Sequence, residues 1–277
     1  MRFHTIMRHA LALAGVAFAL ALPGCQSVQT TQPGVVGVER KQLMLVPEDQ
    51  LRQSAAQAYQ QTLQVAQQKG ALNPDPQMLA RVRRVVGRLV PATAAFRSDA
   101  PNWPWRVNVI QSNQLNAWAM PGGRIAVYSG LITRLDLTDA ELAAILGHEM
   151  AHALREHARE QVSRQMAEQL GFSVAGAALG LGESTQQIAQ VLTNVTFNLP
   201  HSRQAEQEAD RIGVELAARA GYDPRAAVSV WQKMQKAQDG GGPPQFLSTH
   251  PAPGDRLADV RQYAERVMPL YRSAQRS

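Results

Sequence analysis

The stretch LGHEMAHALREHA, from Leu146 to Ala158, contains three of the seven histidines in this 277-residue sequence. His148 and His152 are four positions apart, so on an α-helix they lie one turn from each other and about 40° apart on one face. Glu149 lies between them on nearly the same face. Two imidazoles at this spacing can bind one metal ion, and the carboxylate can reach a water molecule on that ion, as the general base of a zinc hydrolase does. The stretch therefore predicts a metal site and its base on one helix.

This geometry requires a helix, and the flanking residues predict one. Thr138 followed three residues later by Glu141 is typical of a capping box in front of DAELAAILGHEMAHAL. The apolar stripe of this segment consists of Leu142, Ile145, Leu146, Met150, Ala153 and Leu154. His157 lies five positions past His152, about 140° around a continuous helix from the ligand face. We therefore interpret His157 as a surface residue or a neighbour of the ligands, and not as a ligand.

A catalytic zinc ion usually has three protein ligands and one open position, so a third ligand is needed elsewhere. The segment HSRQAEQEADRIGVELAARAG is predicted to be a helix. Its apolar positions are Ile212, Leu216 and Ala217, and Gly221 is expected to end it. It places Glu206 and Asp210 one turn apart on one face. Glu206 would complete a His-His-Glu set, and Asp210 would orient a ligand histidine or help to transfer a proton. Glu208 competes with Glu206, but it points about 200° around the helix from it.

The two motifs together resemble those of a known family. GHEMAH at 147–152 with SRQAEQEAD at 202–210 is similar to the paired signature of the HtpX-like and CAAX-prenyl-protease-like zinc peptidases, the gluzincin family numbered M forty-eight. NAWAMPGGRIAVYSGL is similar to the segment that precedes the metal helix in this family. The similarity extends over roughly residues 75–265. Two motifs in this order are far more specific than either motif alone.

The resemblance implies a role for each candidate residue. The zinc ligands that it implies, for one Zn²⁺ per chain, are His148, His152 and Glu206, with the ligand at the first glutamate of the second motif. It also implies that Glu149 is the general base and that Asp210 is the acid or proton donor. The expected reaction is endopeptidase hydrolysis, in which zinc activates water and polarises a peptide carbonyl, while Glu149 takes a proton and passes it to the leaving amine.

We expect an α+β fold, a mostly helical gluzincin-type metallopeptidase domain with a small β-hairpin or sheet beside the HExxH helix. Helices are predicted at 48–69, closed by Gly70, and at 76–90, with Asp75 as N-cap. Strands are predicted in PWRVNVIQ, LNAWAM and RIAVYS, the last two joined as a hairpin by Pro121, Gly122 and Gly123. An exposed edge strand here could bind an extended peptide by strand addition, or Trp118 and its neighbours could fill the core.

The loop histidine His250 follows the glycine- and proline-rich run DGGGPP, which is typical of a movable loop. Similar members of the family have a Ser-Thr-His-Pro element at this place. His250 could be a removable fourth zinc ligand, or it could stabilise the oxyanion together with Arg256. The alternative is an exposed loop histidine in front of a helix.

The N-terminus has the features of a lipoprotein signal peptide. Arg2 and Arg8 precede an apolar run from Ala10 to Leu22, which is short for a membrane span. The following LPGC resembles a bacterial lipobox, in which the cysteine is lipidated after cleavage. Cys25 is the only cysteine, so it has no disulfide partner, and plain secretion with a free thiol is the alternative. Gln26 in place of an aspartate indicates the periplasmic face of the outer membrane.

The expected organisation is a signal peptide at 1–24, a lipidated N-terminus and tether at 25–42, and a zinc metallopeptidase domain at 43–277. Loss of the two signal-peptide arginines reduces the formal net charge from +6 to +4, and without a basic block this does not favour nucleic-acid binding. GFSVAGAALGLG, from Gly171, is too short for a membrane span and is expected to be a buried turn of helix or a loop. With no internal transmembrane helix and no helical repeat domain, the chain is most similar to the small periplasmic lipoprotein members.

We therefore expect a lipid-anchored periplasmic zinc endopeptidase for quality control of envelope proteins, above all unfolded or misassembled outer-membrane proteins. The expected partners are these protein substrates, the membrane through Cys25, and the outer-membrane assembly machinery, with no nucleic acid. The alternative from another class is a lipid-anchored periplasmic chaperone or assembly factor with a latent or structural metal site. Glu149 argues against this alternative, because a structural metal site needs no base.

Overall fold

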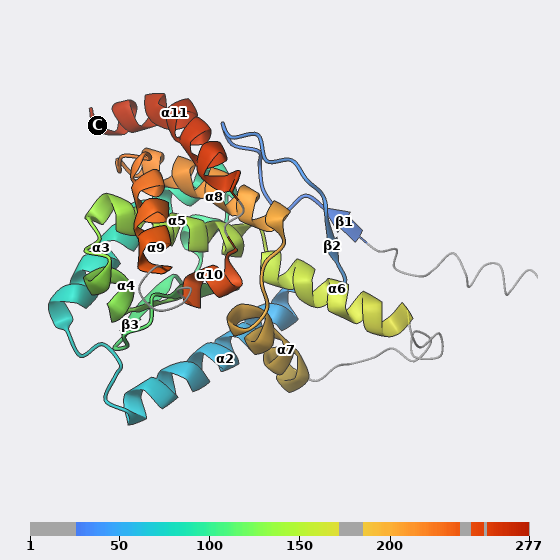
Figure 1. The fold of residues 1–277 in the computed structure, drawn as a ribbon. Coiled ribbons are helices and arrows are strands. Elements are labelled where there is room, and N and C mark those ends of the chain that lie inside the picture. The colour runs from blue at the N-terminus through green and yellow to red at the C-terminus, as the bar shows by residue number, and fades with distance from the viewer. Residues whose placement is uncertain (1–25, 172–184, 239–244, 252–253, 277) are drawn as a thin grey trace, which may run out of the picture.

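The computed structural model describes residues 26–171, 185–238, 245–251 and 254–276. These residues form a mostly helical domain with two small sheets (Figure 1), which confirms the expected α+β class. The helices are α2 (Glu48–Gln68), α3 (Pro76–Ala92), α4 (Ser129–Arg134), α5 (Asp139–Leu154), α6 (His157–Gly171), α7 (Thr185–Phe197), α8 (Arg203–Arg219), α9 (Ala226–Gln238), α10 (Gln245–Thr249) and α11 (Arg256–Ala274). The strands are β1 (Gln26–Val28), β2 (Gln42–Met44), β3 (Arg106–Ile110), β4 (Ala117–Met120) and β5 (Arg124–Tyr128).

The helix boundaries follow the local signals in the sequence. Asp75 caps α3, because its side chain accepts hydrogen bonds from two backbone N–H groups of the first turn. The predicted capping box of α5 is present: the Thr138 hydroxyl accepts a hydrogen bond from the Glu141 N–H, and the Glu141 carboxylate accepts one from the Thr138 N–H. Gly70 follows α2 at φ +64°, and Gly221 follows α8 at φ +74°, a backbone conformation that favours glycine.

The larger sheet has the order β3-β5-β4, with β4 and β5 joined as the predicted antiparallel hairpin and β3 parallel to β5. Strand β4 is therefore an edge strand of this sheet. Trp118 on β4 is only 3% exposed and makes edge-to-face contacts with Tyr59 and Phe197, at ring-centroid distances of 5.7 and 5.1 Å. The Trp118 side chain thus fills the core, while the strand that carries it keeps an unpaired edge among the described residues.

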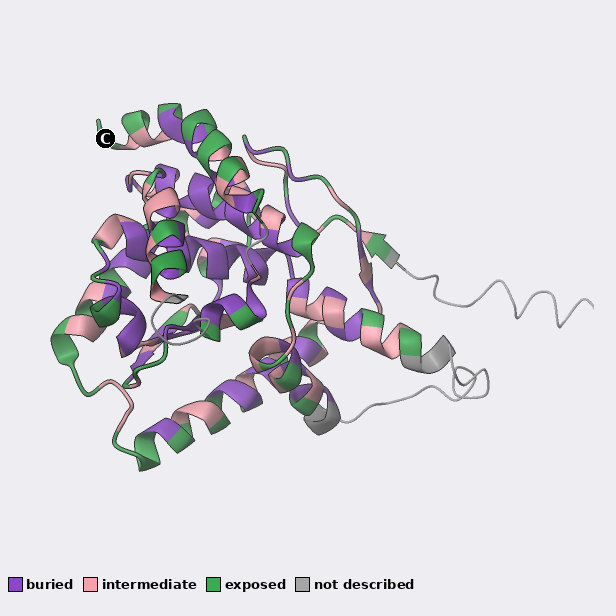
Figure 2. Cartoon of the chain, viewed as in Figure 1, coloured by how far each residue is buried: buried purple, intermediate pink, exposed green. Residues whose placement is uncertain are grey.

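The centre of the domain is the crossing of α5, which is almost entirely buried, and α8, most of which is buried (Figure 2). A Cβ atom at Gly147 of α5 would lie 2.8 Å from the carbonyl oxygen of Gly213 of α8. A Cβ atom at Gly213 would lie 2.8 Å from the backbone nitrogen of His148. The two helix backbones are therefore in direct contact, and only glycine at both positions permits this approach.

Residues 29–46 pack against the domain, although their polar composition suggests a spacer up to residue 42. Val36 and Val38 belong to the main core cluster. The backbone N–H of Val36 donates a hydrogen bond to Glu215 of α8 at 3.0 Å. Strands β1 and β2 pair antiparallel next to α6 (Figure 1). We refer to residues 29–46 as the N-terminal arm.

Several features expected from the sequence lie outside the described residues. They are the signal peptide, Cys25, the DGGGPP run and all of GFSVAGAALGLG beyond Gly171. Among the helices that are described, none combines the length and the apolar character needed to cross a membrane.

The glycine contact generates a stability prediction. Gly213→Ala should destabilise the fold by about 1–3 kcal/mol, because its methyl group would overlap the α5 backbone in a well-packed core. Denaturant unfolding measures the change. Gly87→Ala is the matched control, since Gly87 lies in α3 with no atom within 4 Å of its Cβ position, and alanine there should stabilise by up to about 1 kcal/mol. Unchanged stability of Gly213→Ala would contradict the close crossing.

Candidate metal centre

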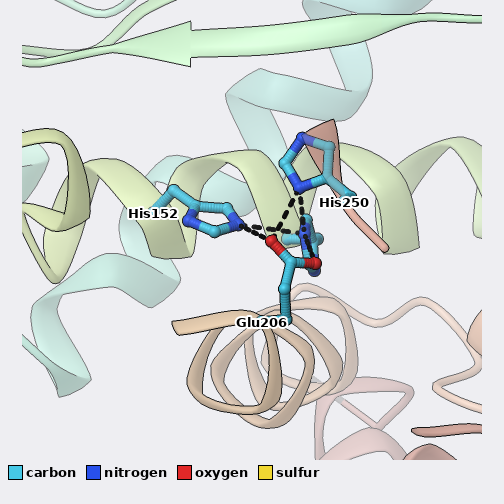
Figure 3. Close-up of side chains that lie close together, drawn as sticks. His152, Glu206 and His250 are labelled. Atoms are coloured by element: carbon cyan, nitrogen blue, oxygen red, sulfur yellow. Dashed lines mark hydrogen bonds and ion pairs between the residues drawn. The ribbon is translucent and has the colours of Figure 1, made fainter. Parts of the chain in front are cut away.

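Four buried side chains from three parts of the chain converge beside the helix crossing. Helix α5 provides His148 and His152, the first turn of α8 provides Glu206, and His250 directly follows α10. One donor atom from each lies within 4.8 Å of the others. Figure 3 shows the rings of His152 and His250 directed at the Glu206 carboxylate. The sequence predicted this group, including the loop histidine as one of two alternatives.

The donor atoms suit a zinc ion. The Nε2 atoms of His148 and His152 are 3.1 Å apart and lie 3.6 and 3.4 Å from the carboxylate oxygens of Glu206. Burial, together with the neighbouring His201, lowers the pKa of His152 well below its usual value, so this ring is neutral, as a metal ligand must be. Burial alone would raise the pKa of Glu206, but His250 and His152 outweigh it and keep the carboxyl ionised. Two imidazoles and a carboxylate form a ligand set of known zinc hydrolases.

The predicted base, Glu149, lies between this group and strand β4. One of its carboxylate oxygens accepts a hydrogen bond from the Ala119 N–H of β4 at 3.1 Å. The other oxygen has no hydrogen-bond partner among the described residues, and the Nε2 atom of His250 lies 3.5 Å from it. Burial raises the pKa of Glu149 above its usual value. A buried carboxylate that is fixed on one oxygen and unpaired on the other is suited to accept a proton.

Asp210 contacts the ligand His148 from behind. Its Oδ1 atom lies 3.0 Å from Nδ1 of His148, and Arg256 donates hydrogen bonds to both carboxylate oxygens at 2.8 Å. A hydrogen on Nδ1 leaves Nε2 of His148 unprotonated toward the metal position. Burial would raise the pKa of Asp210, but Arg256 and His148 outweigh it and lower the pKa. Of the two roles expected for Asp210, this geometry supports the orienting role rather than proton donation.

Arg256 joins the two sides of the group instead of pointing toward a substrate. Besides Asp210, its Nη1 atom contacts the Glu206 carboxylate at 2.7 Å. Arg256 is 1% exposed, so its guanidinium group is buried together with the carboxylates that it contacts. The sequence suggested Arg256 as a helper of His250 at the oxyanion, and in the structure it accompanies Glu206 and Asp210.

His157 is a neighbour of the ligands, which is one of the two positions that the sequence allowed for it, and not a surface residue. Helix α5 ends at Leu154, and the residue before His157, Glu156, has φ +53°. This break in the helix turns His157 back toward the ligands, and its Nδ1 atom lies 2.9 Å from Nδ1 of His152. The angle of about 140° between His157 and the ligand face applies only to a continuous helix, and α5 ends before His157.

His201 was not singled out from the sequence. Its ring stacks on His152 with centroids 4.2 Å apart, and it directly precedes Ser202, the N-cap of α8. All five histidines in the described part of the chain therefore gather at this centre. The available signal was a histidine immediately before the helix that carries the third ligand.

A narrow cleft reaches the base from one side. It is lined by Trp118, Ala119 and Pro121 at β4, by Glu149 and His152 of α5, by Val195 and Thr196 of α7, and by His201 and His250 among others. Since β4 forms one wall, a peptide in this cleft would lie beside the edge strand.

Comparisons with known proteins identify metallopeptidases, in agreement with the motifs of the sequence and with the metal-site geometry. The model of Peptidase family M48 matches residues 76–264. Human "Metalloendopeptidase OMA1, mitochondrial" is 32% identical over 244 residues, which cover 83% of this chain and 44% of the human protein. The fission yeast Schizosaccharomyces pombe "Mitochondrial metalloendopeptidase OMA1" is 31% identical over 183 residues, 66% of this chain and 52% of that protein.

A bacterial relative is found as well. The Escherichia coli "Beta-barrel assembly-enhancing protease" is 29% identical over 207 residues, which cover 71% of this chain and 41% of the relative. The chain thus spans about half, or less, of the length of these curated relatives.

The ligand geometry predicts how metal content responds to substitution. His148→Ala and Glu206→Ala should each lose the zinc, because each removes one of the three fixed ligands and a removable His250 does not replace it. His250→Ala should retain about one zinc per chain on those three ligands. Metal analysis by mass spectrometry after exhaustive dialysis gives the comparison. Full zinc content in both His148→Ala and Glu206→Ala would contradict the assignment of the ligands.

Proposed function

The chain belongs to Peptidase family M48, whose model matches more than half of its residues, and we propose that it is a zinc-dependent endopeptidase for unfolded or misassembled envelope proteins. The observation that carries this function is the Glu149 carboxylate. It lies beside the metal centre, is tied to an edge strand through one oxygen and has its other oxygen unpaired. A structural metal site has no use for such a group.

The chemistry follows from the residues around Glu149. When bound by His148, His152 and Glu206, zinc would supply the Lewis acidity that makes water acidic and a peptide carbonyl electrophilic. Glu149 accepts the proton that the attacking water loses, since one of its oxygens is unpaired. It then gives this proton to the nitrogen of the leaving amine, which balances charge across the reaction. The hydrogen bond from Ala119 keeps the carboxylate in place during both transfers.

The burial of the centre supports unfolded proteins as substrates. His148, His152, Glu206 and His250 are each at most 5% exposed. An extended segment fits this arrangement best, because it can add to the edge of β4 through its backbone, independent of its sequence. A fully folded substrate presents few segments of this kind.

The cellular location is proposed from the sequence. The LPGC motif supports lipidation of Cys25 on the periplasmic face of the outer membrane. The similarity to an Escherichia coli protein whose name refers to β-barrel assembly supports substrates among outer-membrane proteins, with the assembly machinery as a partner.

The decisive variant is Glu149→Gln. It should retain zinc and lose cleavage of an unfolded protein such as casein by a factor of about 10² or more, because the ligands remain while the base does not. Gel-based proteolysis and metal analysis are run on the same samples. If the wild type and the variant were equally inert towards several unfolded substrates but both suppressed aggregation, the chaperone alternative would replace the protease.

His250 has two candidate roles, and they predict opposite effects of His250→Ala on the rate of cleavage. As a removable fourth ligand it would inhibit the resting enzyme, so His250→Ala would raise basal cleavage. As an oxyanion donor it would assist, so the same change would cut turnover by about a hundredfold or more. Its Nδ1 atom lies 3.0 Å from Glu206 and 3.3 Å from Nε2 of His148, which favours the role as a ligand.

Lipidation is tested by mass. Cys25→Ser should yield a protein without acyl chains that fractionates as soluble or remains unprocessed, because the cysteine sulfur is the attachment site. Intact-mass spectrometry and membrane fractionation show the difference. A lipid mass that persists in Cys25→Ser would exclude the lipobox interpretation.

A further inference from the structure

The rear nitrogen of ligand His152 is hydrogen-bonded to a second histidine and not to a carboxylate. Nδ1 of His152 lies 2.9 Å from Nδ1 of His157, and Nε2 of His157 lies 3.2 Å from the Glu208 carboxylate. All three side chains are at most 7% exposed. The arrangement is a chain of contacts that runs from a carboxylate through one imidazole to another.

This chain of contacts determines where the protons lie. An ionised carboxylate only accepts hydrogen bonds, so Nε2 of His157 carries a hydrogen and donates it to Glu208. A neutral imidazole has one N–H, so Nδ1 of His157 is an acceptor, and His152 must donate from its own Nδ1. The Nε2 atom of His152 is then unprotonated, and this is the nitrogen that faces Glu206 and the metal position.

Two guanidinium groups hold the Glu208 carboxylate. Arg155 is fully buried and contacts it at 2.8 Å, and Arg40 of the N-terminal arm contacts it at 2.5 Å. Arg40 also pairs with Glu160, while Arg155 donates a hydrogen bond to the backbone oxygen of Arg40 at 3.0 Å. The arm is thereby connected to the metal helix through charged contacts that solvent hardly reaches.

We propose that His157 and Glu208 are positioning residues that fix the tautomer and the ring orientation of the ligand His152, and that Arg40 of the N-terminal arm holds Glu208 for this task. The arrangement parallels that at the other ligand, where Asp210 and Arg256 do the same for His148. The proposal rests on the metal site of the proposed function, but it does not depend on peptide hydrolysis.

The tautomers can be observed directly in the wild-type protein. Long-range ¹H–¹⁵N correlation spectra of zinc-loaded protein with ¹⁵N-labelled histidine distinguish protonated from unprotonated ring nitrogens. We expect His157 to carry its hydrogen on Nε2 and His152 to carry its hydrogen on Nδ1. A hydrogen on Nδ1 of His157 would overturn the proposal. This result needs no proteolytic activity, so it is separable from the outcome with Glu149→Gln.

Zinc affinity provides the second test. His157→Phe removes the acceptor for His152 and should weaken zinc binding by about 10- to 100-fold in chelator competition. His157→Gln offers a carbonyl oxygen as acceptor and should recover part of this loss. Tyr59→Phe is the matched control, because it removes buried hydrogen bonds, to the Ile125 carbonyl oxygen and from Asn108, at a residue without a hydrogen bond to any ligand, and its zinc affinity should stay within about twofold of the wild type.

Cobalt substitution separates positioning from general destabilisation. The visible absorption of the Co²⁺ protein reports ligand geometry, so His157→Phe should shift its bands, whereas Tyr59→Phe should not. Equal zinc affinity and an unshifted cobalt spectrum in His157→Phe would contradict the positioning role. If His157→Phe does not fold, the wild-type tautomers decide the question alone.

The contribution of the arm is tested with a pair of arginine variants. Arg40→Gln should weaken zinc binding by several-fold, since Glu208 loses one of its two cationic partners. Arg81→Gln is the control, because Arg81 ties another element, α3, to α5 through Asp139 at 2.6 Å, without contact to any ligand. Equal zinc affinities for Arg40→Gln and Arg81→Gln would contradict a role for the arm.

Discussion

The direct backbone contact between Gly147 of α5 and Gly213 of α8 is the constraint on which the rest of the site depends. Glu206 precedes Gly213 by seven residues, two turns on the same face of α8, while His148 directly follows Gly147 and His152 lies one turn further along α5. A side chain at either glycine would push the helices apart and remove the carboxylate from the reach of the imidazoles. Close packing at one point thus sets the spacing between donor atoms that lie far apart in the sequence.

The site also has to keep many charged groups away from water, which is costly unless each is paired. The protein meets this requirement by placing a carboxylate that is paired with arginine behind each ligand histidine, directly behind His148 and behind His152 through His157. Asp210 with Arg256 serves His148, and on the other side Glu208 with Arg155 lies behind His157. Two carboxylate oxygens of the centre lack a hydrogen-bond partner among the described residues: one belongs to the ligand Glu206 and lies 2.7 Å from Nη1 of Arg256, and the other belongs to Glu149. An unpaired buried oxygen in a group that is otherwise hydrogen-bonded is where a reacting proton can be accepted.

Local signals were sufficient to predict the elements that carry the site, and tertiary contacts account for what they missed. The capping box at Thr138, the spacing of His148 and His152, and the periodicity of the helix with Glu206 are all encoded within short segments, and the structure confirms these helices and the hairpin. The position of His157 depends on the positive φ at Glu156. The Glu156 side chain forms ion pairs with Arg97 and Arg159. The order of the N-terminal arm depends on partners more than a hundred residues away, such as Glu208 for Arg40. A polar segment with no hydrophobic periodicity gives no sign of such contacts.

The central claim is that the α5–α8 crossing assembles a zinc site from two imidazoles of one helix and a carboxylate of the other, with Glu149 outside the ligand set. Zinc K-edge X-ray absorption of the loaded wild type and of Glu149→Gln tests it most directly. We expect one zinc per chain, a ligand shell of nitrogen and oxygen at about 2.0–2.2 Å with at least two imidazoles, and the same shell in the variant. A shell without imidazole scattering, or one that changes when Glu149 becomes glutamine, would contradict the account.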